Sequence, residues 1–254
     1  MKKICFIHCC TINNGLIILK ELLDRIIDSN LIDYLERIYI CILGYFTDDN
    51  IENIINYNSK ISICFKDNNI KLYEYPCLKE LYNFSLKTEE NYHILYIHTK
   101  GVFKPYLYGE HQWRKYMSYF MINNFKICNK KLLNGYDTVG CELYKDTIYK
   151  YKYYAGNFWW ANSNYISNNL LNPDIFLKDT KYYINNNIDR FYAEKWLFMT
   201  NKKVFPYNMF GIYRNYIREP IKLKEYINGE DYKQFYLYLL KKNHIKNNTN
   251  KYIK

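Results

Sequence analysis

Apolar, strand-like runs that alternate with amphipathic segments constrain the fold of this chain most strongly. Near the N-terminus, apolar residues dominate Lys2–Cys10 and Arg37–Leu43, and residues 16–29 between them carry leucine and isoleucine at helical spacing. A strand, a helix and a second strand in this order predict a β-α-β unit, and its continuation predicts an α/β fold with a mostly parallel central sheet flanked by helices. Further strands are expected at residues 61–65, 71–75 and 136–143, and further helices at residues 77–86 and 110–127.

The chain has 254 residues, of which 49% are hydrophobic, and is long enough to bury a sizeable core. No linker rich in Pro, Gly or Ser divides it, so we expect one domain over residues 1–205. A C-terminal helical extension and a basic tail are expected over residues 206–254, with a helix at residues 231–242. This extension could cover the core, dimerise or approach a membrane, and we favour the first.

Residues 92–101, YHILYIHTKG, form the clearest candidate for a site. The stretch opens as an apolar run that is typical of a strand buried on both faces, and it ends in His98, Thr99, Lys100 and Gly101. In an open α/β sheet, ligands bind beyond the carboxyl ends of the strands, so His98 and Lys100 are expected at a binding crevice. Gly101 allows a sharp turn or a close approach of the backbone to a ligand. The alternative is a strand with a solvated polar end and a turn glycine.

A second conspicuous stretch is YYAGNFWWA at residues 153–161. In an extended conformation Trp160 faces one side of a sheet and Trp159 the other, so one indole is expected in the core. The other indole could offer an apolar face to a sugar ring or a base, beside Gly156 and the hydrogen-bonding amide of Asn157. Two core tryptophans are the alternative.

Residues 189–198, DRFYAEKWLF, are expected to form a helix on which Arg190 and Glu194 share a face. These two side chains could form an exposed ion pair. A glutamate held in a crevice at the end of a sheet could instead act as a general base toward a hydroxyl group. The sequence alone leaves both interpretations open.

Charge and cysteine content narrow the classes of partner and compartment. The net charge of +11 predicts an anionic partner, which can be a phosphate-bearing small molecule, an anionic membrane face or a nucleic acid. Eight cysteines without a CxxC pair are typical of buried thiols in a reducing compartment. No apolar run approaches the length of a membrane span, so we expect a cytoplasmic location with at most peripheral membrane contact.

Four stretches together resemble a family of GT-A type glycosyltransferases: YIHTKG, HQWRKYM, YYAGNFWWA and DRFYAEKW. The first also resembles the HTK element of the bacterial rhamnan-synthesis glycosyltransferases. The resemblance spans residues 2–198 and rests on the order and spacing of the motifs together. It implies a GT-A, Rossmann-like fold and the transfer of a hexosyl or deoxyhexosyl group from a nucleoside-diphosphate sugar to a hydroxyl group of a glycan or glycoconjugate.

The resemblance also implies roles for individual residues. Glu194 would remove the proton from the acceptor hydroxyl, and Lys100 and His98, near the leaving diphosphate, are the other catalytic candidates. The residues implied in donor binding are Thr11, Asn13, His98, Thr99, Lys100, Gly101, Arg114 and Arg190. Those implied in binding the sugar or the acceptor are Gly156, Asn157, Trp159 and Trp160.

The sequence departs from the usual GT-A pattern at the element that holds a metal. Typical members carry an Asp-x-Asp element at the end of the corresponding strand, where this chain has His98, Thr99 and Lys100. A lysine ammonium about 4 Å from a divalent cation is repelled by several kcal/mol, so no metal ligand is assigned here. The same lysine could neutralise the leaving diphosphate directly. Dependence on Mn²⁺ or Mg²⁺ stays open, since His98 could bind a metal together with Asp137 or Glu142.

Two other functional classes stay open at this point. A catalytically inactive relative would bind a nucleotide sugar without turnover, and the missing Asp-x-Asp element is consistent with it. The sugar, the nucleoside base, the stereochemical outcome and the oligomeric state are not indicated by any motif. A nucleic-acid-binding protein would interleave Lys or Arg with aromatic residues along one face, whereas tryptophans here cluster in one short segment, so we expect no nucleic acid partner.

Overall fold

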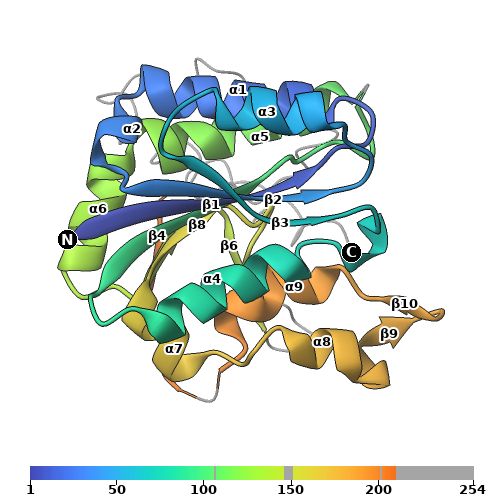
Figure 1. Cartoon of the computed structure of the whole chain (residues 1–254). Coiled ribbons are helices and arrows are strands. Elements are labelled where there is room, and N and C mark those ends of the chain that lie inside the picture. Colours follow the sequence, from blue (N-terminus) through green and yellow to red (C-terminus); the bar gives the residue numbers. More distant parts are fainter. Residues whose placement is uncertain (106, 146–150, 201, 210–254) are drawn as a thin grey trace, which may run out of the picture.

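A computed structural model of the chain describes residues 1–105, 107–145, 151–200 and 202–209. Within these residues, a seven-stranded sheet runs through the molecule in the order β11-β5-β8-β4-β1-β2-β3 (Figure 1). β8 is antiparallel to both of its neighbours, and every other neighbouring pair is parallel. The predicted α/β fold with a mostly parallel sheet is therefore confirmed. The strands are β1 (Lys2–Cys10), β2 (Arg37–Leu43), β3 (Ile61–Asp67), β4 (Tyr92–His98), β5 (Thr138–Gly140), β8 (Trp159–Asn162) and β11 (Pro206–Asn208).

Helices cover both faces of this sheet, and each face buries its own hydrophobic cluster (Figure 1). Successive residues of β1 point to opposite faces, so Cys5 and Ile7 join one cluster while Ile4 and Phe6 join the other. The first face carries α1 (Gly15–Asp28), α2 (Leu31–Tyr34), α3 (Asp48–Ile55), α5 (Tyr108–Ser118) and α6 (Phe125–Leu133). The second carries α4 (Tyr75–Lys87), α7 (Ser163–Asn169), α8 (Asp174–Lys178) and α9 (Phe191–Lys195).

Two short antiparallel pairs lie outside the central sheet. One joins β6 (Leu143–Lys145) to β7 (Lys152–Tyr154), and the other joins β9 (Tyr183–Ile184) to β10 (Asn187–Ile188). β7 leads through a tight turn into β8, and it packs against α9. The β6–β7 pair therefore lies next to the segment that carries Arg190 and Glu194.

The prediction of a strand at residues 71–75 is wrong. Ile70–Leu72 form a single 3₁₀ turn, and Tyr73 has a φ of 48° that does not fit a strand. α4 then begins at Tyr75 with Pro76 in its first turn. Proline suits this position because its fixed φ is helical. Backbone N–H groups in the first turn have no acceptor within the helix, so the missing N–H of proline costs no hydrogen bond. The bounds of β1 and β2, by contrast, coincide with those predicted.

The single helix predicted over residues 110–127 is also wrong in its second half. α5 ends at Ser118, Tyr119–Asn123 form a π-helical turn, and α6 begins at Phe125. The wider turn brings three consecutive apolar side chains into the core. In a regular helix with one face exposed to solvent, three consecutive side chains do not all point to the core. The three buried side chains are Phe120, Met121 and Ile122.

Two further predictions are refined rather than overturned. The strand expected at residues 136–143 is confined to β5, because Glu142 has a φ of 54° and interrupts the extended backbone before β6. The helix expected at residues 189–198 is present as α9 followed by a 3₁₀ turn, Trp196–Phe198. All eight cysteines are free thiols, as expected from their spacing.

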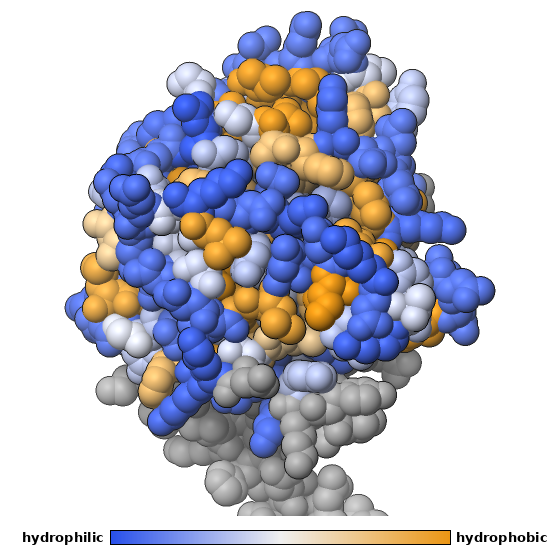
Figure 2. All heavy atoms as spheres, turned by 60° about the horizontal axis from the view of Figure 1, so that its bottom comes forward, coloured by the Kyte–Doolittle hydropathy of each residue, from blue (hydrophilic) through white to orange (hydrophobic). Residues whose placement is uncertain are grey.

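The predicted domain boundary falls immediately before β11, which pairs in parallel with β5 and so belongs to the central sheet. The helix expected at residues 231–242 and the basic tail lie outside the described residues. Within the described ranges, no helix is both long enough and apolar enough to cross a membrane. Figure 2 views the side of α8 and α9, where hydrophobic residues form separate patches among hydrophilic ones.

Candidate functional site

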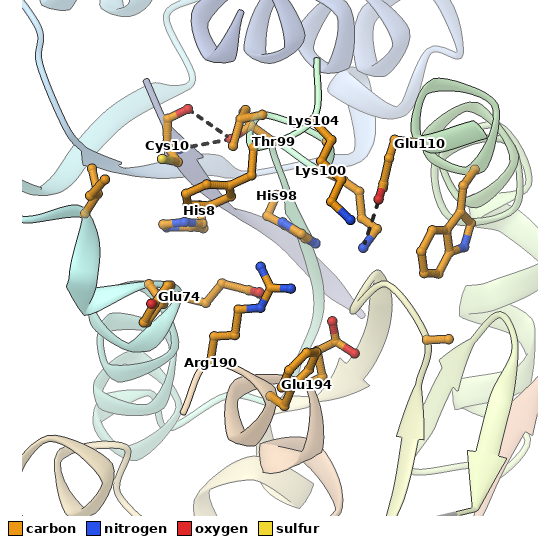
Figure 3. A pocket seen from close by; sticks show the side chains of 18 of the residues that line it. His8, Cys10, Glu74, His98, Thr99, Lys100, Lys104, Glu110, Arg190 and Glu194 are labelled. Atoms are coloured by element: carbon orange, nitrogen blue, oxygen red, sulfur yellow. Dashed lines mark hydrogen bonds and ion pairs between the residues drawn. The ribbon is translucent and has the colours of Figure 1, made fainter. Parts of the chain in front are cut away.

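Polar side chains converge where β1 and β4 end. The two strands are parallel and in register, with His8 opposite His98, so the residues at both strand ends face the same space. A pocket of about 420 Å³ opens there, which is a volume typical of small-molecule sites. The crevice predicted beyond His98 is therefore present, and Figure 3 shows the side chains that surround it.

Charged and aromatic side chains from several segments line this pocket. The charged lining residues are the cations Lys100, Lys104 and Arg190 and the carboxylates Glu74, Glu110 and Glu194 (Figure 3). The aromatic ones are Tyr73, Phe103, Trp113, Tyr144, Tyr153 and Phe191. The predicted site residues that the pocket brings together are His98, Thr99, Lys100, Gly101, Arg190 and Glu194.

Hydrogen bonds fix the turn that follows β4. The buried Thr99 hydroxyl accepts a hydrogen bond from the backbone N–H of Cys10 at 2.9 Å, which ties the end of β4 to the end of β1. Gly101 has a φ of +96°, a backbone conformation that residues with a side chain rarely adopt. Arg114 Nη1 donates to the carbonyl oxygen of Lys100 at 2.8 Å. Lys100 is therefore presented to the pocket from a rigid turn.

The ammonium group of Lys100 is held against one wall of the pocket. Its Nζ lies 4.0 Å from the centre of the Trp113 indole, in a cation–π contact, and 4.0 Å from Glu110 Oε2. The side chain of Lys100 is only 14% exposed. Because an ammonium has three N–H donors and the ion pair with Glu110 is long, Lys100 keeps donors for a bound anion.

Two neutral imidazoles lie at the strand ends. The Nε2 atom of His98 lies 2.9 Å from the carbonyl oxygen of Gly156, and because a carbonyl only accepts, this nitrogen carries a proton. Burial lowers the pKa of His98, and the charge of Glu74 does not restore it. Burial likewise lowers the pKa of His8 to about 4. His98 and His8 therefore act at this site as neutral hydrogen-bonding groups.

The carboxylates Glu74 and Glu194 lie in contrasting surroundings. Burial raises the pKa of Glu194, and the opposing charge of Lys100 offsets this only in part. Burial also opposes ionisation of Glu74, but interactions with His98 and His8 and hydrogen bonds from its neighbours hold its pKa below the ordinary value. The pocket thus contains one carboxylate that binds a proton readily and one that stays ionised.

The predicted exposure of one tryptophan to a sugar is wrong. Trp159 is 1% exposed and Trp160 is fully buried, and they belong to the two clusters on opposite faces of the sheet. Their opposite orientation was predicted correctly. Both indoles are core because β8 is an inner strand with helices on both faces, and their N–H groups donate to Asn157 Oδ1 and to the backbone oxygen of Met121, each at 2.8 Å.

Gly156 and Asn157 stabilise the residues around the pocket and do not line it. Asn157 is 1% exposed and has a φ of 56°, which asparagine tolerates well. Its Nδ2 atom donates to Glu74 Oε2 at 2.7 Å and, more weakly, to the backbone oxygen of Ala193 at 3.4 Å. Since His98 donates to Gly156, this turn joins β4, α4 and α9. The sugar-binding role predicted for the two residues is therefore corrected to a structural one.

Three residues predicted to bind the donor are likewise engaged elsewhere. Thr11 donates to the backbone oxygen of Tyr45 at 2.7 Å, and Asn13 Nδ2 donates to that of Val102 at 2.6 Å. Arg114 is 4% exposed and pairs with Glu21 at 2.8 Å. None of the three lines the pocket, and each one fixes a neighbouring loop instead.

The residues at the end of β4 do not fit a metal held in the usual GT-A way. Among the described residues, no group of three or more His, Cys, Asp and Glu side chains is arranged to hold a metal ion. Asp137 Oδ2 accepts from the backbone N–H of Phe205, and Glu142 Oε1 accepts from the hydroxyl of Tyr116. The alternative in which either carboxylate joins His98 at a metal is therefore not supported.

Several lining residues were not predicted from the sequence. His8 ends β1 much as His98 ends β4, so the polar end of the first strand was a usable signal. Glu74 and Tyr73 were hidden by the wrong strand assignment at residues 71–75. Lys104 lies in the turn after Gly101, and no spacing rule indicated that it returns to the pocket.

Most of the chain matches a known protein family. Residues 15–231 match a domain of unknown function, DUF8361. The chain belongs to this family. Among curated proteins, none matches the DUF8361 chain at a significant level.

Among solved structures, the 4-diphosphocytidyl-2C-methyl-D-erythritol synthase from Anaerococcus prevotii DSM 20548 aligns with 94% of the DUF8361 chain and 99% of its own, at 15% identity and a TM-score of 0.43. A second structure of a 4-diphosphocytidyl-2C-methyl-D-erythritol synthase aligns with 94% of the chain and 97% of its own, at 12% identity and a TM-score of 0.35.

Proposed function

We propose that this DUF8361 chain is a glycosyltransferase that moves a sugar from a nucleoside-diphosphate sugar to a hydroxyl group of a glycan or glycoconjugate. One observation carries the proposal: Lys100, Arg190 and Glu194 line a single pocket beyond the carboxyl ends of parallel strands. The first two supply positive charge for a leaving diphosphate, and the third supplies a base for an attacking hydroxyl. The motif resemblance to GT-A enzymes supports the same assignment.

The donor diphosphate is bound by the cationic part of the pocket. Lys100, Lys104 and Arg190 come from the turn after β4 and from the start of α9, and all three project toward the centre of the cavity in Figure 3. Amino and guanidinium groups make strong, charge-assisted hydrogen bonds to phosphate oxygens. These side chains occupy the role that carboxylate-bound metal has in the usual GT-A pattern, and the proposed scheme needs no metal ligand from the protein.

Glu194 activates the acceptor. Its raised pKa gives the carboxylate a higher affinity for a proton than an exposed glutamate has, which suits a general base. The acceptor hydroxyl loses its proton to Glu194 as its oxygen forms a bond to the anomeric carbon. The bond from that carbon to the diphosphate oxygen breaks at the same time, and the nucleoside diphosphate leaves with the electron pair. This single displacement inverts the configuration of the sugar.

The acceptor is expected to lie against Tyr144 and Tyr153. These residues oppose each other on the β6–β7 pair, and their rings stack with centres 5.8 Å apart. Both line the pocket on the side where β7 packs against α9, close to Glu194. Aromatic faces of this kind suit the apolar face of a sugar ring. They take the role that the sequence assigned to Trp159 and Trp160.

A thermal-shift screen of UDP-, GDP- and dTDP-sugars, with and without Mn²⁺, tests the proposal. A ligand that binds only the folded state raises the melting temperature, so one nucleotide class is expected to raise it by several degrees. Lys100→Ala is expected to lose most of this shift, because the leaving diphosphate loses its main cationic contact.

Lys87→Ala is the matched control, because it removes the same charge from an exposed position at the end of α4. It is expected to keep the full shift. An absence of any shift from every nucleotide sugar would count against the transferase. Binding without release of nucleoside diphosphate would instead identify an inactive, donor-binding relative.

A further inference from the structure

Glu74 lines the pocket but has no part in the proposed transfer of the sugar. It immediately precedes α4, and its Oε2 atom accepts hydrogen bonds from the hydroxyl of Tyr96 at 2.6 Å and from Asn157 Nδ2 at 2.7 Å. Both donors belong to side chains that are at most 1% exposed. The carboxylate is therefore fixed in one orientation by groups that cannot move away from it.

The second oxygen of Glu74, Oε1, has no hydrogen-bond or ion-pair partner within the part of the chain that the structure describes. Among the described residues, no lysine or arginine approaches the carboxylate closely enough to pair with it. The pKa of Glu74 lies below the ordinary value, so the group is ionised at neutral pH and can only accept hydrogen bonds. An ionised oxygen held in a ligand-sized pocket without a partner is a site for a ligand donor.

His8 supplies a complementary group beside it. The side chain is 5% exposed and lines the same pocket, and its Nδ1 atom is buried without a hydrogen-bond partner among the described residues. Because Nδ1 is inaccessible, Nε2 is the ring nitrogen left for a ligand in the pocket. Glu74 and His8 lie on the same side of the cavity in Figure 3, away from Lys100 and Glu110.

The backbone next to Glu74 is strained in a way that fits a binding role. Tyr73 has a φ of 48° and a ψ of −135°, a combination that is costly for any residue with a side chain. This conformation lets Tyr73 and Glu74 both line the pocket from adjacent positions. Strain of this kind persists where the surrounding structure enforces it, and it is common at ligand sites.

We propose that Glu74 and His8 form a subsite that binds hydroxyl groups of the donor, with Glu74 Oε1 accepting from a hydroxyl whose oxygen in turn accepts from His8 Nε2. This inference rests on the proposed transferase function. A hydroxyl fits because it donates and accepts at one atom, whereas an N–H group can satisfy only the carboxylate. The hydroxyls can come from the ribose of the nucleotide or from the transferred sugar.

Isothermal titration of four ribonucleoside diphosphates, UDP, CDP, GDP and ADP, and of their 2′-deoxy and 3′-deoxy forms tests the subsite. If Glu74 binds the ribose, loss of the contacted hydroxyl weakens binding to the wild type about 10- to 100-fold, as expected for a hydrogen bond to a charged group. Glu74→Ala should bind the ribonucleotide more weakly than wild type by a similar factor. Removing the hydroxyl from the nucleotide should then cause no further loss of affinity in this variant.

If Glu74 binds the transferred sugar instead, the diphosphates bind Glu74→Ala and wild type equally, and only the nucleotide sugars of the thermal-shift panel lose affinity. Glu74→Gln keeps an oxygen for Tyr96 and serves if the alanine variant does not fold. Glu52→Ala, an exposed carboxylate on α3, is the matched control and should leave every affinity unchanged.

Equal affinity of wild type and both Glu74 variants for every nucleotide and nucleotide sugar overturns the subsite and leaves the transferase intact. If no probe binds the wild type, the transferase proposal itself fails, and the subsite fails with it. The two failures are therefore distinguished by the wild-type titration alone.

Discussion

At the scale of single residues, the site depends on two carboxylates that the fold treats differently. Interactions with His98 and His8 and two fixed hydrogen bonds hold the pKa of Glu74 below the ordinary value. Burial raises the pKa of Glu194, and the charge of Lys100 offsets only part of that rise. When the surroundings of two carboxylates give them different pKa values, one can bind a ligand as an anion while the other accepts a proton. Lys100 couples to the second of them because its charge opposes the effect of burial on Glu194.

The pH dependence of turnover follows from this coupling. The base form of Glu194 is required, so kcat/KM should fall as the pH decreases through a pKa above that of an ordinary glutamate. Because the charge of Lys100 lowers the pKa of Glu194, Lys100→Met should move this acid limb to higher pH. Removing the negative charge of Glu74 with Glu74→Gln should move it to lower pH. Profiles of log kcat/KM against pH check both shifts, and an acid limb that stays fixed in both variants argues against Glu194 as the base.

At the scale of elements, the turn between β7 and β8 connects the parts of the site. Gly156 accepts a hydrogen bond from His98, and Asn157 contacts both Glu74 and the backbone of α9. The turn requires glycine at position 156 for two reasons. Gly156 has a φ of +85°, and the side chain of Met117 occupies the space that a Cβ atom would need. A change in this turn therefore alters the position of three elements together.

Gly156→Ala should destabilise the fold by about 2–4 kcal/mol, because it adds left-handed backbone strain to a steric clash. A Cβ atom at this position would overlap Met117 Sδ. Gly135→Ala is the matched control, since Gly135 has a φ of +91° and nothing within 4 Å of the added atom. This control should lower the free energy of unfolding only by the backbone strain, about 1–2 kcal/mol. Urea unfolding measures both, and equal losses would show that the contact with Met117 is unimportant.

Sequence reasoning succeeded where one local pattern decides the structure. The apolar runs of β1 and β2 set their bounds, and the abrupt polar end of β4 indicated the pocket. It failed where the outcome depends on distant partners. Trp160 is buried because its strand lies inside the sheet, and Glu74 reaches the site because Tyr73 adopts a rare conformation. Neither the order of strands nor a positive φ is encoded in the spacing of nearby residues.

At the scale of the whole molecule, the fold buries histidines in their neutral form. Burial lowers the pKa of His8 and of His93 to about 4, and it also lowers that of His98. His93 lies in β4, 1% exposed, with its Nδ1 atom 2.5 Å from Asn129 Oδ1. The sheet that forms the site therefore also makes the stability of the protein sensitive to acid.

The melting temperature should fall as the pH decreases from about 6.5 toward 4. The unfolded chain binds protons at these histidines near pH 6.5 and the folded chain does not, so the stability they provide is complete above pH 6.5 and declines below it. Each of His8 and His93 should contribute up to about 3 kcal/mol to this decline. His93→Leu should make the decline shallower, even if the variant melts lower at neutral pH. A melting temperature that is constant between pH 7 and 5 contradicts this account.

The most direct test of the proposed transfer is the release of nucleoside diphosphate by wild type and Glu194→Gln. The donor is the nucleotide sugar that gives the largest thermal shift, and methyl glycosides serve as acceptors. Wild type should release the diphosphate, and Glu194→Gln should do so at least about 100-fold more slowly while binding the donor with unchanged affinity, because only proton removal is lost. If the variant releases the diphosphate as fast as wild type, Glu194 is not the base and the proposed mechanism is wrong.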